Sequence, residues 1–568
     1  MFEVAPFVPF FAAAALALFM RGWPRGLLMV AVPIAGLANL WLLGEGSFGS
    51  WSVLDFQLLL FRADKLSLLF GYLFHIAALI AVIYALHLRD TLQQVASLLY
   101  AGSALGAVFA GDLLTLFIFW ELLALTSVML IWARRSGRAY IAGLRYFALH
   151  ILSGLLLLGG TIFYGQAHGS LEFGQIGLGQ GGFQGMGGWM IFLAFGIKCA
   201  FPFFHNWLTD AYPESTPTGT VFLSAFTTKV AVYALARAYP GTELLVYIGA
   251  TMACFPIFYA VIENDLRRVL AYSLINQLGF MVVGIGIGTS LAINGAVAHA
   301  FNDVIFKGLL FMSMGAVLHV TGRINGSELG GLYKTMPKTT VLCIVGAASI
   351  SAFPLFSGFV SKSMVMSAAI ANGYDWVWLI LLFASAGVFH HAGIKIPYFA
   401  FFAHDSGLRA KEPPVNMLVA MSIAAALCLL VGIYPQALYR LLPHEMVYSP
   451  YDMTHVLTQL QLLFFSALAF VWLNLRRLYP PELPSVNLDV EWLYRRLLPN
   501  AARGFVNGAF RLDQRLRGVA LRSVGNLIDG ITGHHRPEGL MARSWLTGSM
   551  AAGVVLLLGI YLLLGFST

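Results

Sequence analysis

The chain contains a long series of apolar stretches, each of which is long enough to cross a lipid bilayer as a helix. Crossing roughly 30 Å of hydrocarbon takes about 20 mainly apolar residues, and only helices or closed barrels satisfy their backbone hydrogen bonds there. The apolar windows lie at 4–20, 26–43, 66–86, 92–110, 112–133, 140–165, 189–212, 218–238, 243–262, 268–288, 291–320, 340–372, 376–403, 415–441, 454–475 and 546–566. We therefore predict an all-α polytopic membrane protein with about sixteen transmembrane helices.

The overall composition excludes an ordinary soluble protein, because 59% of the 568 residues are hydrophobic and only 11% are charged. The formal net charge of +8 could suggest nucleic acid as a partner, but the basic residues lie in short loops and in one late segment. A membrane location is sufficient to explain them. The first window follows an acidic start without an A-x-A-like cleavage site, so we expect a first span and not a cleaved signal peptide.

No metal or cofactor is predicted. The cysteines occur singly within apolar runs, without a CxxC pair or a nearby histidine at metal-binding spacing, and this is typical of apolar packing residues; they are Cys199, Cys254, Cys343 and Cys428. The glycine-rich stretch 174–188 lacks the GK[ST] ending of a phosphate-binding loop, so we expect a flexible external connection there.

Loop charge predicts the orientation, because cytoplasmic loops collect lysine and arginine. The odd-numbered connections carry Arg21, Arg25, Arg89, Arg134, Arg135, Arg138, Arg267, Arg268, Arg323, Lys334, Lys338, Arg409 and Lys411. This asymmetry predicts both termini outside, in a cell inner membrane, with the arginine-rich segment 476–543 in the cytoplasm. That segment mixes apolar residues and arginine at near-helical spacing, which fits either a tether at anionic lipid or a brace that binds neighbouring subunits.

We expect any brace in 476–543 to be interrupted, because prolines and a glycine punctuate the segment. These residues are Pro481, Pro484, Pro499 and Gly530.

A buried lysine beside a helix break is the clearest functional signal. The stretch IFLAFGIKCAFPFFHNW places Lys198 in an apolar span that Pro202 interrupts four residues later. An ammonium at membrane depth costs several kcal/mol and usually faces a protein interior or a water-filled path. Broken helices at that depth are where the coupling-ion sites of transporters lie, so Lys198 is predicted to titrate.

A second buried charge, Glu121 in DLLTLFIFWELLALTSVML, needs a cationic partner, and Lys198 is our first choice. Arg145 and Lys229 lie in adjacent spans as further basic groups, although either could instead be a structural counter-ion or a snorkelling side chain. His205, just past the break, could relay a proton or cap the helix end.

Three ionisable residues in AVAHAFNDVIFKGLLFMSMGAV share one helix face, because His299, Asp303 and Lys307 follow at intervals of four. Such a row within an apolar span is more typical of proton conduction than of packing. A second interrupted span then repeats the first in kind, with Pro354 and Gly358 before Lys362.

The next histidines and lysine could form the exit of a proton path or interfacial anchors; they are His390, His391 and Lys395.

Several of these stretches together resemble a known family. IFWELLALTSVMLI, GIKCAFPFFHNWLTDAYPESTPT, AHAFNDVIFKGLLF and FPLFSGFVSKS are similar to motifs of the proton-conducting, antiporter-like membrane subunits, over roughly residues 60–440. That family includes distal subunits of respiratory complex I and the A and D subunits of Mrp-type cation/proton antiporters. The stretch HHAGIKIPYFAFFAHDSG resembles the proteins like the Mrp D subunit more closely.

The resemblance implies a 14-helix core with two inverted five-helix repeats, each with a broken helix. It implies that Glu121 pairs with Lys198, that Lys307 is the central lysine and that Lys362 is the terminal one. Lys229, His299 and Asp303 would belong to the hydrated axis that joins them. Ser363 stands where some members carry an acidic residue, which leaves the exit-side partner of Lys362 open.

The predicted organisation is N-terminal helices 1–90, a first repeat 91–240, a second repeat 241–405, C-terminal core helices 406–475, a cytoplasmic basic segment 476–543 and an anchor 544–568. We expect a transporter subunit, not an enzyme, that translocates protons within a multisubunit Mrp-type antiporter, with other membrane subunits as partners and Na⁺ or K⁺ carried by a neighbour. One alternative is a proton-pumping subunit of complex I or of a hydrogenase-like complex. Another is a non-transporting scaffold.

Overall fold

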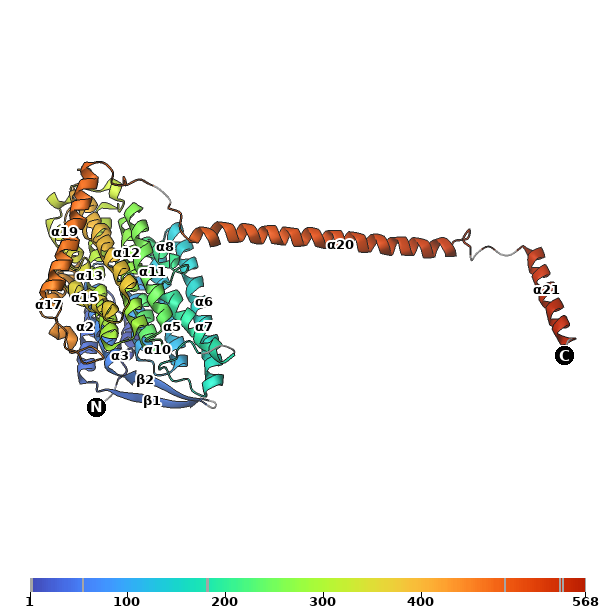
Figure 1. The fold of residues 1–568 in the computed structure, drawn as a ribbon, viewed down its shortest axis with the longest axis horizontal. Coiled ribbons are helices and arrows are strands. Elements are labelled where there is room, and N and C mark those ends of the chain that lie inside the picture. Colours follow the sequence, from blue (N-terminus) through green and yellow to red (C-terminus); the bar gives the residue numbers. More distant parts are fainter. Residues whose placement is uncertain are drawn as a thin grey trace. The chain divides into compact units, whose positions relative to one another are not determined.

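The computed structural model describes residues 4–53, 56–179, 183–484, 487–540, 543 and 546–566. It divides into two compact units, Met1–Asn487 and Leu488–Thr568, which are treated separately below. The first unit is a helical bundle crossed at one end by a β-hairpin (Figure 1).

The helices of the first unit are α1 (Val8–Phe19), α2 (Trp23–Leu42), α3 (Lys65–Ala85), α4 (Thr91–Phe109), α5 (Leu113–Trp132), α6 (Gly137–His168), α7 (Phe183–Lys198), α8 (Asn206–Glu214), α9 (Gly219–Ala225), α10 (Thr227–Ala238), α11 (Glu243–Ile262), α12 (Leu266–Ile287), α13 (Ser290–Thr321), α14 (Pro337–Ile350), α15 (Ser357–Ala371), α16 (Asp375–Val388), α17 (Val415–Ile433), α18 (Gln436–Tyr439) and α19 (Met453–Leu475). Short 3₁₀ turns span Gly326–Glu328 and Leu332–Lys334. After α16 the chain continues as π-helix at Phe389–Lys395 and Tyr398–Phe402.

The prediction of a polytopic all-α membrane protein is confirmed. Within the described residues, thirteen helices are long and apolar enough to span a membrane, and three shorter apolar helices accompany them. Each of the sixteen predicted windows contains one of these. The short ones fall in the first window and in the two windows for which a break was predicted.

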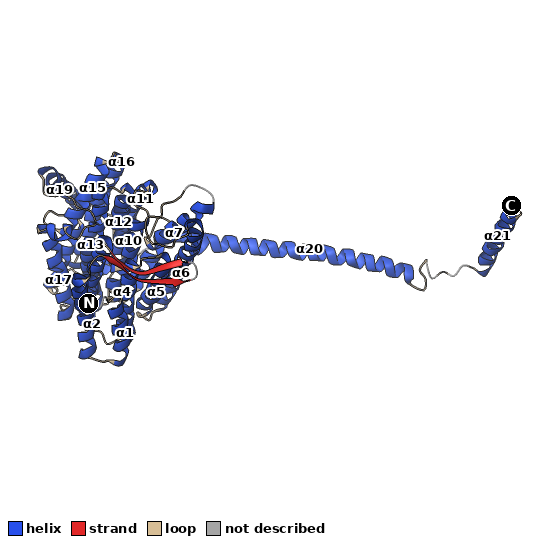
Figure 2. Cartoon of the chain, turned by 90° about the horizontal axis from the view of Figure 1, so that it is seen from below, coloured by secondary structure: helices blue, strands red, loops and turns tan. Residues whose placement is uncertain are grey.

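An antiparallel hairpin was not predicted. Strands β1 (Gly46–Val53) and β2 (Phe56–Ala63) pair with Gly46 opposite Ala63, and they run side by side across the end of the bundle (Figure 2). The amide of Gly111, in the α4–α5 turn, donates to the carbonyl of Leu59 at 3.0 Å. The end of β2 is tied to α10 by Asp64, which accepts from Arg237 at 2.8 Å. The hairpin therefore fixes one end of the helices that carry the buried charges.

The predicted external connection 174–188 lies next to this end. The amides of Ile176 and Gly177 donate to the carbonyl of Ala238 at 2.9 and 3.1 Å, so this part of the connection is held in place. Residues 180–182 lie outside the described residues.

The two helix breaks have the same backbone construction. Between α7 and α8, Ala200 and Phe203 have φ values of 61° and 72°, and between α14 and α15, Ala352 and Leu355 have 59° and 74°. Each pair encloses a phenylalanine followed by a proline, in AFPF and AFPL respectively. Left-handed backbone at residues with a Cβ is unfavourable, and its repetition marks both breaks as built features of the fold.

The matching hydrogen bonds confirm this likeness. After α7, Ala200 and Phe201 donate to Ile197 and Gly196, and after α14, Ala352 and Phe353 donate to Ser349 and Ala348 in the same pattern, all at 3.0 to 3.1 Å. Both first half-helices thus end at the break in the same way. Such an end carries partial negative charge and favours a cation.

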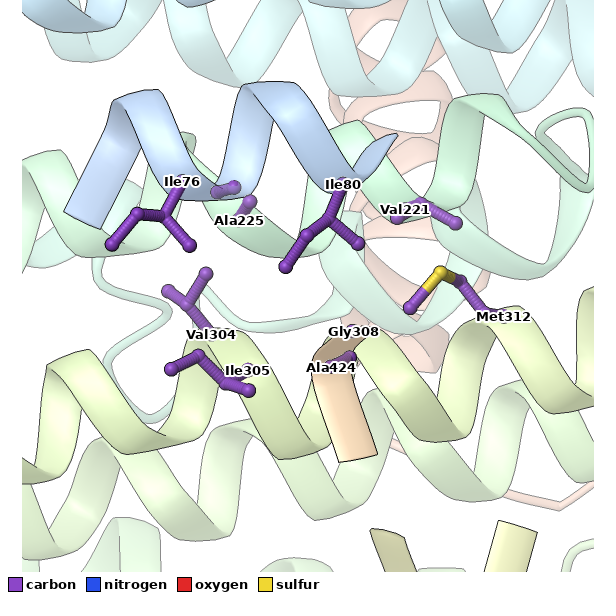
Figure 3. Close-up of a pocket in the computed structure, with 10 residues that line it drawn as sticks. Ile76, Ile80, Val221, Ala225, Val304, Ile305, Gly308, Met312 and Ala424 are labelled. Carbon is purple, nitrogen blue, oxygen red and sulfur yellow. The ribbon is translucent and has the colours of Figure 1, made fainter. Parts of the chain in front are cut away.

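Helix α13 lies inside the bundle, where it packs against α3, α9, α10, α12, α14, α15 and α17. On one side, Val304, Gly308 and Met312 face Ile80 and Val221 across a cavity of about 20 Å³ (Figure 3). All of the residues that line this cavity are apolar. A cavity so small and apolar stays dry, so this side of α13 offers no water path.

The second unit contains a π-helical turn at Leu493–Leu497, the long helix α20 (Leu498–His535) and α21 (Thr547–Gly565). The predicted interruption at Pro499 and Gly530 is wrong, because α20 is continuous over 38 residues. Pro499 lies in the first helical turn, where its missing N–H costs nothing. A single internal glycine costs only about 1 kcal/mol.

Two of the arginines that predicted the orientation are buried. The guanidinium of Arg25 donates to Thr91 and Gln94 at 2.9 and 2.8 Å. Arg267, fully buried, donates to the carbonyl groups of Pro213 at 3.0 Å and Ser215 at 3.1 Å. Its planar fork therefore holds the turn between α8 and α9, which leads from the first break to Lys229.

Replacing Arg267 by methionine is expected to lower the free energy of unfolding by about 3 kcal/mol, because it leaves buried carbonyl groups unsatisfied. Thermal unfolding of the purified protein in detergent measures this. The matched control is Arg138→Met, since Arg138 is 80% exposed and pairs with Glu214 only at 3.3 Å. It is expected to cost at most about 1 kcal/mol. Equal losses in the two variants would contradict the role given to Arg267.

Candidate functional site

A row of polar side chains crosses the interior of the first unit, centred on α13. His299, Asp303 and Lys307 are fully buried on this helix, as their spacing predicted. Lys229 on α10 and Lys362 on α15 approach the row from neighbouring helices, and both are at most 2% exposed.

The centre of the row is an ion pair between Lys229 and Asp303. The Lys229 Nζ lies 2.6 Å from Asp303 Oδ2, with both side chains completely buried. Lys229 Nζ also donates to the carbonyl of Ser224 at 3.3 Å, at the discontinuity between α9 and α10. Sequence analysis placed both residues in one polar axis but did not predict that they pair.

The discontinuity between α9 and α10 falls at Phe226, whose φ of −106° and ψ of −66° depart from helical values. The hydroxyl of Tyr100 accepts from the freed amide of Thr227 at 3.1 Å. A third interrupted span, beside the two predicted ones, therefore presents Lys229 to the row.

The other row residues bind neutral groups. Lys307 Nζ donates to the hydroxyl of Ser273 at 2.7 Å. The ring of His299 bridges Ser361 and Gln277, with Nδ1 2.9 Å from Ser361 Oγ and Nε2 3.2 Å from Gln277 Oε1. An imidazole with two such partners can pass a proton by exchanging donor and acceptor roles.

Both broken helices present a lysine to the end of a half-helix. Lys198 is the last residue of α7, and Lys362 Nζ donates to the carbonyl of Ile350, the last residue of α14, at 2.8 Å. Lys362 belongs to α15, after its break, whereas Lys198 precedes its own. The Lys362 ammonium therefore lies at the negative end of a half-helix dipole, whereas that of Lys198 binds a carbonyl within α5.

Lys198 and Glu121 are neighbours across α5 and α7. The Lys198 ammonium donates to the carbonyl of Trp120 and lies 4.3 Å from the centre of its ring. Lys198 and Glu121 attract each other electrostatically, but the described residues do not include a contact ion pair between them. The two predicted partners, Glu121 and Lys198, are therefore close enough to interact electrostatically, without a direct contact between their charged groups in the described part of the chain.

The carboxylate of Glu121 occupies space that a glycine leaves open. A Cβ on Gly154 of α6 would lie 1.4 Å from Glu121 Oε1. Nearby, the Trp120 indole donates to Ser153 at 2.9 Å, and Ser153 donates to the carbonyl of Ala194 at 2.7 Å. Helix α6 thus positions both neighbours of Lys198.

The remaining candidates lie outside the row. Nε and Nη2 of Arg145 both donate to Oδ2 of Asp210, at 2.8 and 2.6 Å, which supports the counter-ion interpretation. His205 is buried with its ring 4.7 Å from that of Phe255. His390 packs its ring against Phe470.

Lys395 and His391 are both buried, and His391 lies close enough to Lys307 to interact with it electrostatically. Lys395 Nζ lies 2.9 Å from Glu482 Oε1 and donates to the carbonyl groups of Val261 and Glu263 at 2.6 Å. Burial raises the pKa of the Glu482 carboxyl, while Lys395 acts in the opposite direction. The chain after α19 is thereby anchored to the π-helical segment that follows α16.

Sequence analysis missed the neutral members of the row, Ser273, Gln277, Ser361 and Asn302, because uncharged polar residues within apolar spans did not enter the search. It also missed His150, which is buried between Tyr146 and Trp207. The described residues do not contain a group of three histidine, cysteine or carboxylate side chains that could hold a metal ion.

Comparison with known proteins supports the family resemblance. Residues 110–390 match the family described as NADH:quinone oxidoreductase/Mrp antiporter, transmembrane. The A/B subunit of a probable K⁺/H⁺ antiporter from Rhizobium meliloti is 30% identical over 66% of this chain, and hydrogenase-4 component B of Escherichia coli is 25% identical over 67% of it. The chain spans only 40% and 63% of the lengths of these relatives.

A solved structure of the Mrp complex from Dietzia sp. contains a chain with the same fold. It superimposes with a TM-score of 0.78 at 23% identity, and covers 94% of this chain and 63% of that one.

Replacing Gly154 by alanine is expected to displace the Glu121 carboxylate and to lower the free energy of unfolding by about 1 to 3 kcal/mol through overpacking. Gly308→Ala is the matched control, because a Cβ at Gly308 meets no atom within 4 Å. It should be neutral, or stabilising by up to about 1 kcal/mol. Thermal unfolding of both variants provides the comparison, and an undisturbed Gly154→Ala protein would refute the placement of Glu121.

Proposed function

We propose that this chain is a proton-translocating subunit of a multisubunit cation/proton antiporter. Through residues 110–390 it belongs to the NADH:quinone oxidoreductase/Mrp antiporter family of transmembrane proteins. The proton path consists of Glu121, Lys198, Lys229, His299, Asp303, Lys307 and Lys362. Arg145, His205, His390, His391 and Lys395 are assigned to structure or to the ends of the path.

The proposal rests mainly on a difference between the buried lysines, namely whether the ammonium group contacts a neutral oxygen or a carboxylate. Lys198, Lys307 and Lys362 bind carbonyl or hydroxyl oxygens, so each can release a proton without breaking a contact ion pair among the described residues. Lys229 cannot do so, because Asp303 would remain as an isolated buried anion. Three lysines therefore suit the role of proton carriers, and Lys229 suits the role of a charge that is held in place.

Opening the Lys229–Asp303 pair would act on the carriers on both sides. At an effective dielectric constant of about 20, a unit charge 4 Å away is worth about 4 kcal/mol. This corresponds to about three powers of ten in proton affinity. A small displacement of Asp303 relative to Lys229 and Lys307 is therefore sufficient to move a proton along the row, without a large backbone motion.

The relatives suggest what surrounds the chain. One is named as a subunit of a K⁺/H⁺ antiporter, so we assign protons to this chain and leave K⁺ or Na⁺ to a neighbouring membrane subunit. In this arrangement 91–240 and 241–405 are the two inverted repeats. The chain lies in the cell inner membrane, with both termini outside and 476–543 in the cytoplasm.

A second candidate is a proton-pumping subunit of a respiratory or hydrogenase-type complex, because hydrogenase-4 component B is similar over two thirds of the chain. Identifying the subunits that copurify with the native chain separates the two. Small antiporter subunits would support the first candidate, whereas hydrogenase or quinone-reducing subunits would replace it with the second.

Lys198→Ala and Glu121→Gln are expected to lower proton uptake by the reconstituted complex at least about tenfold, a typical loss when a proton-transfer group is removed. Uptake into proteoliposomes is followed with a pH-sensitive dye. Lys411→Ala, which alters an exposed loop lysine, is the control and should behave like the unmodified chain. Near-normal uptake in both variants would rule out this path.

Variants that remove one or both charges of the Lys229–Asp303 pair distinguish its contribution to stability from its contribution to proton uptake. Lys229→Met and Asp303→Asn each leave one buried charge unpaired, and each is expected to cost about 3 to 5 kcal/mol of stability. The double variant removes both charges, so it should recover most of the stability. Its proton uptake should nevertheless remain low, and full recovery of uptake would show that the pair serves only the fold.

A further inference from the structure

A cleft lies beside Lys362, on the side that faces away from α13. It has a volume of about 210 Å³ and is lined by residues of α15, α16 and α19, among them Lys362, Ser363, Ser367 and His455. At about 30 Å³ for each water molecule, this space holds roughly seven. Lys362 therefore borders both the buried row and a space that is large enough for water.

Polar side chains connect the cleft to the surface. The Tyr448 hydroxyl interacts with the hydroxyls of Ser363 and Ser367, the latter at 3.1 Å. Ser367 Oγ lies 2.9 Å from Nε2 of His455, and Nδ1 of His455 lies 2.5 Å from Asp452 Oδ2. The chain of contacts begins at the residue next to Lys362 and ends at a carboxylate.

Exposure rises along the same chain. Lys362 is 2% exposed, whereas the side chains of His455 and Asp452 are 32% and 49% exposed. His455 lies in the first turn of α19, and Asp452 caps that helix by accepting from the His455 amide at 2.7 Å. The carboxylate is thus fixed in place by the helix start that also carries the imidazole.

We propose that His455 and Asp452 form the port through which Lys362 exchanges protons with the solution at the mouth of this cleft. The proposal rests on the proton-translocating function proposed above, and it supplies the partner that Ser363 leaves open. Asp452 keeps Nδ1 of His455 protonated, so that Nε2 faces Ser367 and the cleft as an acceptor. A proton from the Lys362 ammonium, passed through water or Ser367, converts His455 to imidazolium, which then releases it to the solution.

Few charged or titratable groups surround His455. Asp452 faces it from the start of its own helix, Tyr448 from the preceding loop with ring centres 6.2 Å apart, and Lys362 from α15 across the cleft. The α16 residues that line the cleft, Trp378 and Leu382, are not titratable. Asp452 is therefore the charged group in direct contact with the His455 ring.

The first test is His455→Ala in the reconstituted complex, which should lower the rate of proton uptake about tenfold. A proton-transfer group typically raises a rate roughly a hundredfold, and water in the cleft is expected to replace part of that effect. Added imidazole, which the cleft can admit, should restore most of this rate. His168→Ala alters another exposed histidine and should change neither the rate nor its response to imidazole. Normal uptake in His455→Ala, or a loss that imidazole does not relieve, would overturn the port.

The second test is Asp452→Asn, which keeps the shape of the helix cap but removes the charge. Because the carboxylate holds the Nδ1–H group and so keeps Nε2 directed at Ser367, its loss should lower proton uptake severalfold, whereas Asp452→Glu, which keeps a carboxylate, should retain most of it. Normal uptake in Asp452→Asn, or an equal loss in Asp452→Glu, would contradict the proposal. Lys307→Ala distinguishes a failure of the port from a failure of the proposed function. If Lys307→Ala loses uptake but His455→Ala does not, only the port is refuted. Normal uptake in Lys307→Ala refutes the proposed function itself.

Discussion

The burial of four ammonium groups in an apolar bundle is the constraint on which the rest of the structure depends. Each lysine must find an oxygen, which comes from a backbone carbonyl on a neighbouring helix, from the end of a half-helix or from a polar side chain. Lys198 and Lys362 use the carbonyl groups of Trp120 and Ile350. Lys307 uses a serine, and of these four described lysines only Lys229 has a carboxylate in contact. The site is therefore a consequence of how the backbone is broken.

The two breaks show how the sequence encodes this arrangement. AFPF and AFPL adopt the same left-handed backbone at two places, and at the second break the half-helix end faces Lys362. Gly358 makes the second break compact, because a Cβ there would lie 1.9 Å from the carbonyl oxygen of Ser349. The non-glycine residues that adopt the left-handed backbone at the two breaks are in a costly conformation, and the packing around them holds them in it. The carbonyl groups at the breaks are therefore accessible without any unfolding of the helices.

The membrane helices and the charged residues of the site could be predicted from sequence, because both depend on local patterns. Apolar length predicts a span, and an intervening lysine, histidine or aspartate stands out against it. The pairing of Lys229 with Asp303 could not be predicted, since it depends on how α10 meets α13. The hairpin was missed because its strands are too short to span a membrane. Arg267 was interpreted as a loop charge because its carbonyl partners come from a distant turn.

The dry side of α13 has a consequence for energy conversion. Around the cavity between α13, α3 and α9 (Figure 3), a proton in the polar row meets apolar side chains, in a space too small and too apolar to hold a water chain. Leakage in that direction would require an unsolvated ion, which costs far more than any step between neighbouring lysines. If the chain carries protons as proposed, Val304, Gly308 and Met312 keep them from escaping sideways from the row around this cavity.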